Sequence, residues 1–346
     1  MTVKVSIIGA TGYTGQELVK ILKNHPHVEI VGLGSQNYVG EPFDKVYPNL
    51  RGFSMICKST EDDFLIKEAD IVFLALPHGH ALPFVEKALS WGKKIIDLGA
   101  DFRLKDPQIY SEWYSHHGPG ENILAQAVYG LPEINKHKIE TTQIVAYPGC
   151  YPTTVILALA PLLKKNLIDA KNIIIDSKSG VSGAGRGLSL TTHFCEVNED
   201  FKAYSVPRHR HIPEMEQELS LLAEENVTIT FTPHLLPITR GMLSTIYCVP
   251  NNQLKENDLR ELYTDFYSNC PFVRLVDKGE IPHTKWVLGT NYCDLGLFLD
   301  KRTGRIIIFS AIDNLLKGAS SQAVQNMNIM ACLEETSGLD FIGLCP

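Results

Sequence analysis

Short apolar runs alternate with amphipathic stretches along the first half of the chain. The runs at 3–8, 27–33, 69–76 and 93–98 are mostly apolar, as strands are when both faces of a sheet are covered. Helical patterns separate them, for example at 16–22. This alternation up to about residue 150 predicts a parallel, doubly wound sheet in an α/β fold.

The second half has more strand-like runs and fewer helices between them. Strands are expected near 172–177, 227–231, 243–249, 293–299 and 305–309. Because few helices separate these runs, we expect a mixed, largely antiparallel sheet. The segment 233–241 is expected to connect two strands, and a long helix is expected to open at Asp313 and run through Cys332.

A glycine cluster follows the first strand directly, in the sequence Gly9-Ala-Thr-Gly-Tyr-Thr-Gly15. The first glycine permits a tight turn, and the later ones let backbone approach a phosphate and let helix pack on strand. The spacing differs from the common G-x-G-x-x-G but still fits a phosphate loop at a helix N-terminus. It predicts dinucleotide binding, and an ordinary strand-to-helix turn is the alternative.

The ribose-binding position lies at the end of the second strand. An Asp or Glu there would favour NAD, but this chain has Gly34-Ser-Gln-Asn37 and no carboxylate. We therefore expect NADP(H), bound by Ser35 and Gln36, with Lys45 or Arg51 as possible cationic partners.

Cys150 lies in the stretch Ala146-Tyr-Pro-Gly-Cys-Tyr-Pro-Thr-Thr154, between a short strand-like run and an apolar helix-like run. Pro152 suits the first turn of a helix. Cys150 would then sit at a helix N-terminus, where the helix dipole and the unpaired N–H groups favour a thiolate and an oxyanion. The pattern predicts a covalent cysteine enzyme, and a structural cysteine is the alternative.

A second chemical stretch contains His209-Arg-His211 and is followed by Pro213 and Glu214. We expect His211 just ahead of a helix N-terminus, where the dipole favours the neutral imidazole that a general base needs. Glu214 is close enough in sequence to orient a ring. The glycine-rich stretch 178–187, with hydroxyls and two cations, predicts an anion loop or a flexible connector.

Length and composition narrow the class of protein. The 346 residues predict about two domains, and 44% hydrophobic with 21% charged residues is typical of a globular protein. A net charge of −7 argues against nucleic-acid or membrane partners, and no apolar run is long enough for a membrane span. The N-terminus begins with a strand-like run rather than a signal peptide. The eight cysteines are scattered without a C-x-x-C pair, so we expect a cytoplasmic protein with no metal site.

In these motifs the chain resembles the N-acetyl-γ-glutamyl-phosphate reductases of arginine biosynthesis. The resemblance extends from the first strand to the last helix and includes Asp97-Leu-Gly-Ala-Asp-Phe-Arg103, Tyr147-Pro-Gly-Cys-Tyr-Pro-Thr153 and Asp313-Asn-Leu-Leu-Lys-Gly-Ala319. That family is similar in fold to aspartate-semialdehyde and glyceraldehyde-3-phosphate dehydrogenases. Gln36 stands where many relatives carry an arginine.

The resemblance implies an NADP-binding Rossmann domain of residues 1–149 and 313–346, because the last helix returns to it, and a catalytic and oligomerisation domain of residues 150–312. The reaction would reduce N-acetyl-γ-glutamyl phosphate to N-acetyl-L-glutamate 5-semialdehyde and phosphate through a thioester on Cys150. The partner is a small-molecule substrate, and a homodimer or homotetramer is expected.

The residues expected at the site fall into three groups. The expected catalytic residues are Cys150, His211, His209 and Glu214, with the base not assigned between the two histidines. The expected cofactor-binding residues are Gly9, Thr11, Gly12, Tyr13, Thr14, Gly15, Ser35, Gln36, Pro77, Ser182, Gly183 and Asn314. The expected substrate-binding residues are Arg103, Lys178, Arg186, Tyr204 and Arg210.

Three other functions remain open from the sequence. An aspartate-semialdehyde dehydrogenase would use the same cysteine chemistry on a smaller acyl phosphate, and a lysine-pathway enzyme would act on a carrier-bound substrate. A non-catalytic NADP-sensing protein would need the glycine loop but not Cys150 together with the histidines.

Overall fold

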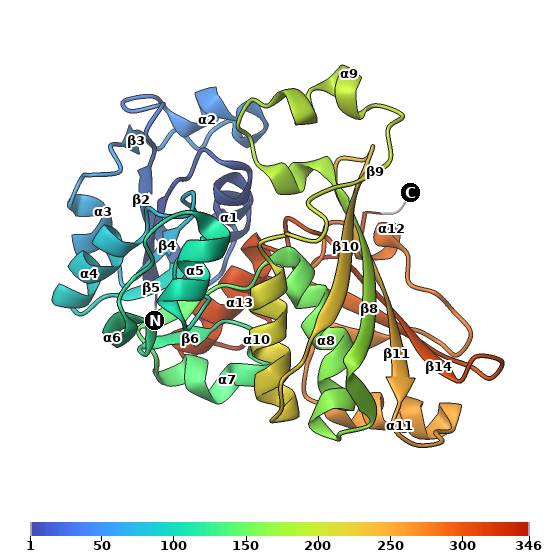
Figure 1. Cartoon of the computed structure of the whole chain (residues 1–346). Coiled ribbons are helices and arrows are strands. Elements are labelled where there is room, and N and C mark those ends of the chain that lie inside the picture. Colours follow the sequence, from blue (N-terminus) through green and yellow to red (C-terminus); the bar gives the residue numbers. More distant parts are fainter. Residues whose placement is uncertain (1, 345–346) are drawn as a thin grey trace. The chain divides into compact units, whose positions relative to one another are not determined.

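The computed structural model describes residues 2–344, which fall into two compact units (Figure 1). The first comprises residues up to Pro148 together with Ala319–Asp340. The second comprises Gly149–Gly318, and the described residues 341–344 group with it. By their contacts, residues 313–318 therefore belong to the second unit.

The first unit is built on a parallel seven-stranded sheet in the order β3-β2-β1-β4-β5-β7-β6. Its strands are β1 (Val3–Ile8), β2 (Val28–Gly34), β3 (Cys57–Lys58), β4 (Ile71–Leu74), β5 (Lys94–Asp97), β6 (Ala127–Tyr129) and β7 (Ile144–Ala146). Its helices are α1 (Tyr13–Lys23), α2 (Phe43–Val46), η1 (Pro48–Leu50), α3 (Phe64–Lys67), α4 (Leu82–Ser90), α5 (Pro107–Tyr114), α6 (Glu121–Leu124), α7 (Pro132–Thr141) and α13 (Ser320–Met330). The predicted doubly wound α/β domain is confirmed.

Helix α13 is polar yet wholly buried, because its amides bond to other parts of the same unit. Asn326 donates to the Gly130 carbonyl at 2.9 Å, and Oδ1 of Asn328 accepts from Nε2 of His25 at 3.0 Å. The helix packs on α1 and α7. The prediction that it opens at Asp313 was wrong: residues 314–319 form turns, and the helix begins at Ser320.

The second unit contains a mixed seven-stranded sheet in the order β12-β13-β14-β11-β8-β10-β9. Its strands are β8 (Ile168–Gly180), β9 (Lys202–Ala203), β10 (Ile229–Leu236), β11 (Met242–Pro250), β12 (Val273–Leu275), β13 (Cys293–Asp300) and β14 (Arg305–Ile312). The pairs β8–β10 and β12–β13 are parallel, and the other neighbours are antiparallel, as predicted. Strand β10 continues through Pro233 to Leu236, so the segment 233–241 is only partly a connector.

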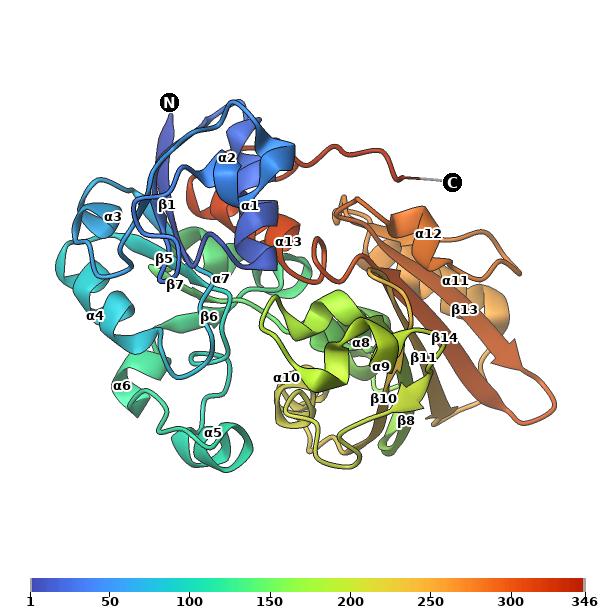
Figure 2. The same cartoon turned by 90° about the horizontal axis from the view of Figure 1, so that it is seen from above.

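The helices of this unit are α8 (Cys150–Lys164), η2 (Val181–Ala184), η3 (Leu190–Thr192), α9 (Phe194–Val197), α10 (Ile212–Ala223), α11 (Glu256–Phe266) and α12 (Thr284–Val287). Helix α8 packs on β8, β11 and β14 and lies beside α10 (Figure 2). Its residues from Tyr151 to Leu163 are buried, so its position is held from several sides.

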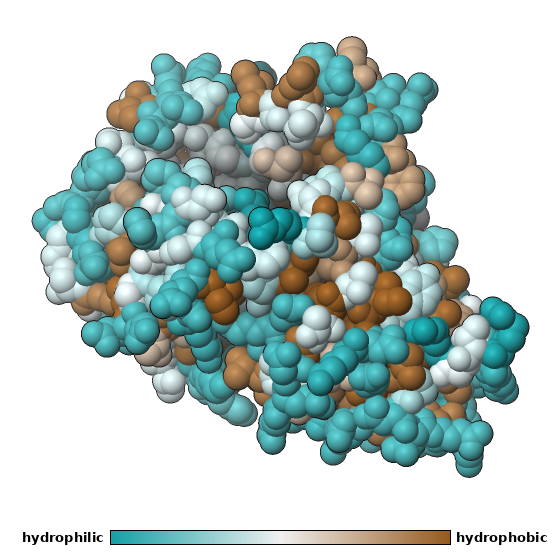
Figure 3. All heavy atoms as spheres, in the orientation of Figure 1, coloured by the Kyte–Doolittle hydropathy of each residue, from teal (hydrophilic) through white to brown (hydrophobic). Residues whose placement is uncertain are grey.

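Helix α11 closes one side of the same core. The hydroxyls of Tyr263 and Tyr267 donate to carbonyls of Ala158 and Leu157 on α8. The opposite surface of α11 is mainly hydrophilic, as Figure 3 shows. Each tyrosine therefore holds α8 in two ways, by the packing of its buried ring and by the hydrogen bond of its hydroxyl.

Candidate active site

Cys150 is the first residue of α8, as the sequence predicts. Gly149 caps the helix without a side-chain hydrogen bond, and Pro152 lies in the first turn. The Thr153 N–H bonds to the Gly149 carbonyl at 3.0 Å. The N–H groups of the first turn lie at the positive end of the helix dipole, which favours a thiolate or an oxyanion.

The imidazole of His211 lies directly against Gly149. A Cβ atom added to Gly149 would come within 2.7 Å of both Cε1 and Nε2 of His211. Gly149 has an ordinary helix-cap backbone, with φ −66°, so glycine is required here by space rather than by conformation. The absence of a side chain lets the ring approach the residue that precedes Cys150.

Glu214 connects the starts of α10 and α8. His211 caps α10 and Glu214 lies in its first turn, as predicted. The Glu214 carboxylate is fully buried, and its Oε1 accepts the Gly149 N–H at 2.7 Å. Glu214 thus holds the backbone beside Cys150, a contact that the sequence did not indicate.

The two histidines differ in environment. The Nδ1 of His209 accepts the His211 backbone N–H at 3.1 Å, and the two rings meet edge to face with centroids 4.9 Å apart. Burial, together with the nearby charge of Arg210, lowers the pKa of His209 to about 4. His209 is therefore neutral near pH 7, with Nδ1 used as an acceptor for backbone.

Tyrosines cover the other side of His209. The hydroxyls of Tyr151 and Tyr204 lie 3.0 Å apart, and both rings contact His209 edge to face. Burial raises the pKa of Tyr204 to about 12, and the negative charge of Cys150 contributes to the rise. Cys150 therefore lies within electrostatic range of Tyr204.

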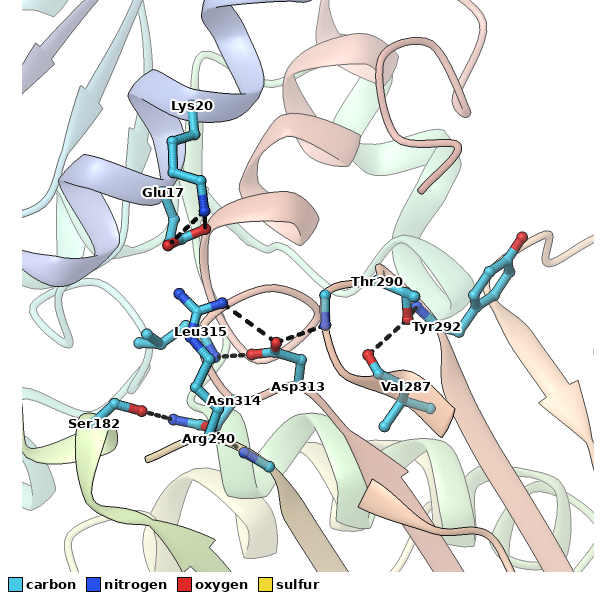
Figure 4. Close-up of polar contacts among 12 residues, drawn as sticks. Glu17, Lys20, Ser182, Arg240, Val287, Thr290, Tyr292, Asp313, Asn314 and Leu315 are labelled. Carbon is cyan, nitrogen blue, oxygen red and sulfur yellow. Dashed lines mark hydrogen bonds and ion pairs between the residues drawn. The ribbon is translucent and has the colours of Figure 1, made fainter. Parts of the chain in front are cut away.

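A polar network of the second unit lies around the turn after β14 (Figure 4). Asn314 accepts the Gly241 N–H at 2.8 Å and donates to the Ser182 hydroxyl at 2.9 Å. A Cβ atom added to Gly318, at the end of this turn, would come within 2.9 Å of the Cys150 Cβ. The structure thus brings Ser182 and Asn314 together and places the end of the same turn against Cys150.

The remaining predicted residues of this unit differ in position. Lys178 alternates on β8 with the buried Ser177, whose hydroxyl bonds to Ser244 at 2.7 Å. Its side chain therefore projects from the opposite face of the sheet, where its Nζ lies 3.7 Å from Asp176. Gly183, Arg186 and Arg210 are exposed, and a Cβ atom added to Gly183 would lie 3.8 Å from Nδ2 of Asn314. Lys178 is not part of the cluster around Cys150.

The glycine loop of the first unit connects β1 to α1. Gly9 has φ +89°, and a Cβ atom there would come within 2.2 Å of the Ala75 carbonyl oxygen. A Cβ atom on Gly15 would meet the Gly9 oxygen at 2.4 Å. Gly12, which caps α1 without a side-chain bond, has only the Gly9 oxygen at 3.6 Å, so space is left where backbone would meet a pyrophosphate.

Neighbouring residues hold this loop in place. The Thr11 and Ser35 hydroxyls are 2.9 Å apart, and Tyr47 donates to the Thr11 carbonyl at 2.8 Å. Ser35 is buried, whereas Gln36 is exposed. Sequence reasoning missed Tyr47, which follows α2 and has no motif around it.

The stretch Asp97–Arg103 forms a buried polar group in the first unit. Arg103 donates from Nε to the Tyr147 carbonyl at 2.7 Å and from Nη2 to Leu98. Burial and the charge of Asp101 raise the pKa of Asp97 to about 7. Arg103 therefore supports the backbone two residues before Gly149, in addition to any contact with substrate.

Asp101 was not singled out from the sequence. Its carboxylate accepts the N–H groups of Gly79 and Ala81 at 2.7 and 2.9 Å, and the Tyr110 hydroxyl at 2.7 Å. It fixes the turn after β4, which begins at the exposed Pro77. The sequence signal that could have identified Asp101 is its position four residues after Asp97 in the same motif.

Three further properties concern the described part of the chain as a whole. Within residues 2–344, no group of three or more His, Cys, Asp or Glu is arranged to hold a metal ion. None of the helices described is both long and apolar enough to cross a membrane. No disulfide joins the seven cysteines that the structure covers, and Cys345 lies outside the described residues.

Two family models match the chain. Residues 4–142 match the family described as "Semialdehyde dehydrogenase, NAD binding domain", and residues 150–314 match "Semialdehyde dehydrogenase, dimerisation domain". The first match covers the glycine loop, and the second begins at Cys150.

Full-length relatives narrow the family. The chain is 58% identical over 347 residues to the N-acetyl-gamma-glutamyl-phosphate reductase of Pelotomaculum thermopropionicum, covering 100% of both chains. It is 54% identical over 345 residues to the enzyme of the same name from Desulforudis audaxviator, covering 99% of this chain and 100% of the relative.

Solved structures show the same fold at low identity. Aspartate semialdehyde dehydrogenase II of Vibrio cholerae is 16% identical with a TM-score of 0.74, covering 96% of this chain and 99% of that one. The enzyme of Candida albicans, solved with NADP, is 15% identical with a TM-score of 0.72, covering 95% and 99%. The fold, the two matched domains and the full-length relatives show that the chain belongs to the N-acetyl-gamma-glutamyl-phosphate reductase family of semialdehyde dehydrogenases.

Proposed function

We propose that the protein catalyses the NADPH-dependent reduction of N-acetyl-γ-glutamyl phosphate to N-acetyl-L-glutamate 5-semialdehyde and phosphate, as a step of arginine biosynthesis. The observation that carries the mechanism is the placement of Cys150 at the start of α8, with the His211 ring against Gly149. The relatives with the matching name support the choice of substrate.

Cys150 acts as the nucleophile. Its thiolate attacks the acyl carbon, the C–O bond to phosphate breaks, and phosphate leaves with the electron pair. The resulting thioester is more electrophilic than a carboxylate, and the thiolate is a good leaving group later. The N–H groups at the start of α8 stabilise the negative oxygen that forms on the acyl carbon.

His211 handles the proton of the hemithioacetal that forms after reduction. It protonates the oxygen of this intermediate, and the same imidazole takes the proton back when the C–S bond breaks to release aldehyde and thiolate. His209 is less suited to this role because its Nδ1 accepts backbone and its pKa is lowered to about 4. Glu214 keeps the Cys150 helix start in place through Gly149.

The glycine loop fits a dinucleotide, since Gly12 leaves open space and the start of α1 has no side-chain cap. The residues proposed to hold NADP(H) are Gly9, Thr11, Gly12, Tyr13, Thr14, Gly15, Ser35, Gln36 and Pro77 in the first unit, with Ser182, Gly183 and Asn314 in the second. When bound, NADPH supplies the hydride for the thioester. Residues 1–149 and the C-terminal helix would form the domain that binds it, and residues 150–312 the catalytic domain.

Cations are proposed to bind the phosphate and carboxylate of the substrate. Arg186 and Arg210 are exposed and belong to the unit that carries Cys150, and Tyr204 lies within electrostatic range of Arg210. Arg103 is a candidate from the first unit, with part of its guanidinium already bound to backbone. Lys178 is the weakest of these candidates because of its position on the sheet.

We also propose a homo-oligomer, a dimer or tetramer, located in the cytoplasm, with neither nucleic acid nor membrane as a partner. The matched family is described as a dimerisation domain, and the segment around α9 exposes Leu188, Leu190 and Phe194. Figure 3 shows hydrophobic surface in the region where Figure 1 labels α9. The cysteines without disulfides fit a reducing compartment. Light scattering of the purified protein tests the oligomer; a monomer at micromolar concentration would contradict it.

The test of function is the reverse reaction, followed by NADPH absorbance during phosphate-dependent oxidation of N-acetylglutamate semialdehyde. Aspartate semialdehyde is assayed in parallel, as are Cys150→Ala and Cys150→Ser. We expect turnover with the acetylated substrate only, and at least about a thousandfold loss in both variants with NADP binding retained.

Three other results would each contradict a different part of this proposal. Turnover of aspartate semialdehyde alone would replace the proposed substrate. Measurable turnover by the Cys150 variants would disprove the covalent mechanism. NADP binding without turnover of either aldehyde would favour the carrier-bound substrate or the sensor function.

A further inference from the structure

Asp313 lies immediately after β14 and is fully buried, although it carries a carboxylate. A buried charge is stable only when donors surround it. Its Oδ1 accepts the Leu315 N–H at 2.9 Å, and its Oδ2 accepts the Gly289 N–H at 3.0 Å. The same Oδ2 lies 3.5 Å from Nη1 of Arg240 (Figure 4).

These donors come from three separate segments of the second unit. Leu315 belongs to the turn that follows Asp313, Gly289 lies between α12 and β13, and Arg240 lies between β10 and β11. A single carboxylate therefore joins three connections that the sequence separates by 24 residues or more.

The turn that Asp313 organises leads to the nucleophile. The Asp313 carbonyl accepts the Gly318 N–H at 2.9 Å, which closes the turn. At Gly318 an added Cβ atom would meet the Cys150 Cβ at 2.9 Å. The end of the turn thus lies in contact distance of the residue that forms the thioester.

The position of Asn314, the next residue in the turn, also depends on Asp313. Asn314 bonds to Gly241 through Oδ1 and to Ser182 through Nδ2, so both ends of its amide are fixed. Arg240, the partner of Asp313, directly precedes Gly241, the partner of Asn314. A shift of Asp313 would therefore move the Asn314 amide as well as the wall beside Cys150.

We propose that Asp313 is a positioning residue for the reaction, which acts by holding the turn 313–318 so that Cys150 and Asn314 keep their reactive placement. Asp313 itself makes no contact with substrate in this proposal. The inference rests on the proposed function, because its first readout is turnover.

The main variant is Asp313→Asn. An amide has one acceptor where the carboxylate has two, so its NH2 group must face either a backbone donor or the guanidinium. We expect kcat to fall about ten- to hundredfold, with the KM values for semialdehyde and NADP within about threefold, since misplacement by a fraction of an ångström affects the reacting geometry first.

Asp294→Asn is the matched control. Asp294 is also buried, is in the same unit and pairs with Arg274 at 2.7 and 2.9 Å, but it has no bond to the turn 313–318. We expect a comparable fall in melting temperature in both variants but an unchanged kcat in Asp294→Asn. Equal kcat values for the two variants would overturn the proposal.

Amide hydrogen exchange provides a readout that needs no substrate. In Asp313→Asn, peptides covering both 313–318 and 150–154 should exchange faster than in the wild type and in Asp294→Asn. Faster exchange in 313–318 alone, with wild-type kcat, would show a merely structural role. If the wild type shows no turnover, the proposed function fails, and the exchange at 150–154 still decides the role of Asp313.

If Asp313→Asn does not fold, Arg240→Gln provides a second test of the proposal. It leaves the Gly289 and Leu315 donors in place and removes only the guanidinium, so we expect a smaller fall in kcat, about three- to tenfold. Wild-type kcat and wild-type exchange at 150–154 in Arg240→Gln would contradict the proposal.

Discussion

Two helix starts in this protein share a local design but differ in what surrounds them. Both α1 and α8 begin after a glycine that caps the helix without a side-chain bond. Around Gly12 an added Cβ atom would meet only one backbone oxygen, at 3.6 Å, whereas around Gly149 it would meet the His211 ring at 2.7 Å. One start is open to a ligand, and the other is enclosed by protein side chains.

The difference shows what decides the function of a helix N-terminus. Backbone N–H groups and the helix dipole favour negative charge at both ends. At α1 the charge can come from a bound phosphate, because space has been left for it. At α8 the proposed function places the thiolate of Cys150, and His211 and Glu214 occupy the surroundings.

Of the substitutions that test this comparison, filling the space beside Gly149 should have the largest effect on kcat. In Gly149→Ala the methyl group would displace the His211 ring, and we expect kcat to fall about a hundredfold. Gly120→Ala is the control, because Gly120 also caps a helix with nearly the same backbone, φ −69° and ψ 158°, and has open space around it. The NADPH assay of both variants measures the effect; equal activities would mean that the ring position is unimportant.

Filling the open space at Gly12 should have a smaller effect, on affinity rather than on the chemical step. Gly12→Val should weaken NADP binding about tenfold while the melting temperature changes little. Gly15→Ala should instead lower stability by about 1–3 kcal/mol, because its Cβ meets backbone oxygens at 2.4 and 2.6 Å. Fluorescence titration and thermal unfolding separate the two; unchanged affinity in Gly12→Val would place the pyrophosphate elsewhere.

The smallest expected effect is on the pH dependence of the free energy of unfolding, and it comes from His209. The pKa of His209 is lowered from 6.5 to about 4, so the unfolded chain binds a proton first as pH falls. Stability is therefore complete above the unfolded pKa and decreases between about pH 6.5 and 4, by about 1 kcal/mol at pH 6.

Urea unfolding at pH 8 and pH 6 checks this expectation, with His209→Gln as the comparison. The wild type should lose about 1 kcal/mol more than His209→Gln over this interval. An equal loss in both proteins would mean that the imidazole of His209 is already solvated in the folded state.

Local pattern was sufficient to predict much of the fold and the position of Cys150. The apolar run at β1, the glycines that follow and the proline after Cys150 act within a few residues, so their consequences can be read from neighbouring positions. The start of α13 could not be predicted in this way. The segment 313–319 is compatible with a helix locally, but the Asp313 carboxylate bonds to distant loops and keeps the segment in turns.

By itself the sequence predicted the two kinds of sheet, the glycine loop between β1 and α1, the position of Cys150 at a helix start and the resemblance to its family. These depend on periodicity and on residues close together in the chain. Only the tertiary structure decided that His211 lies against Gly149, that Glu214 holds that glycine, that Lys178 projects from the other face of β8, and that Asp313 joins three loops near Cys150. The physical reason is that each of these depends on contacts or sheet geometry set by chain packing, which local sequence does not specify.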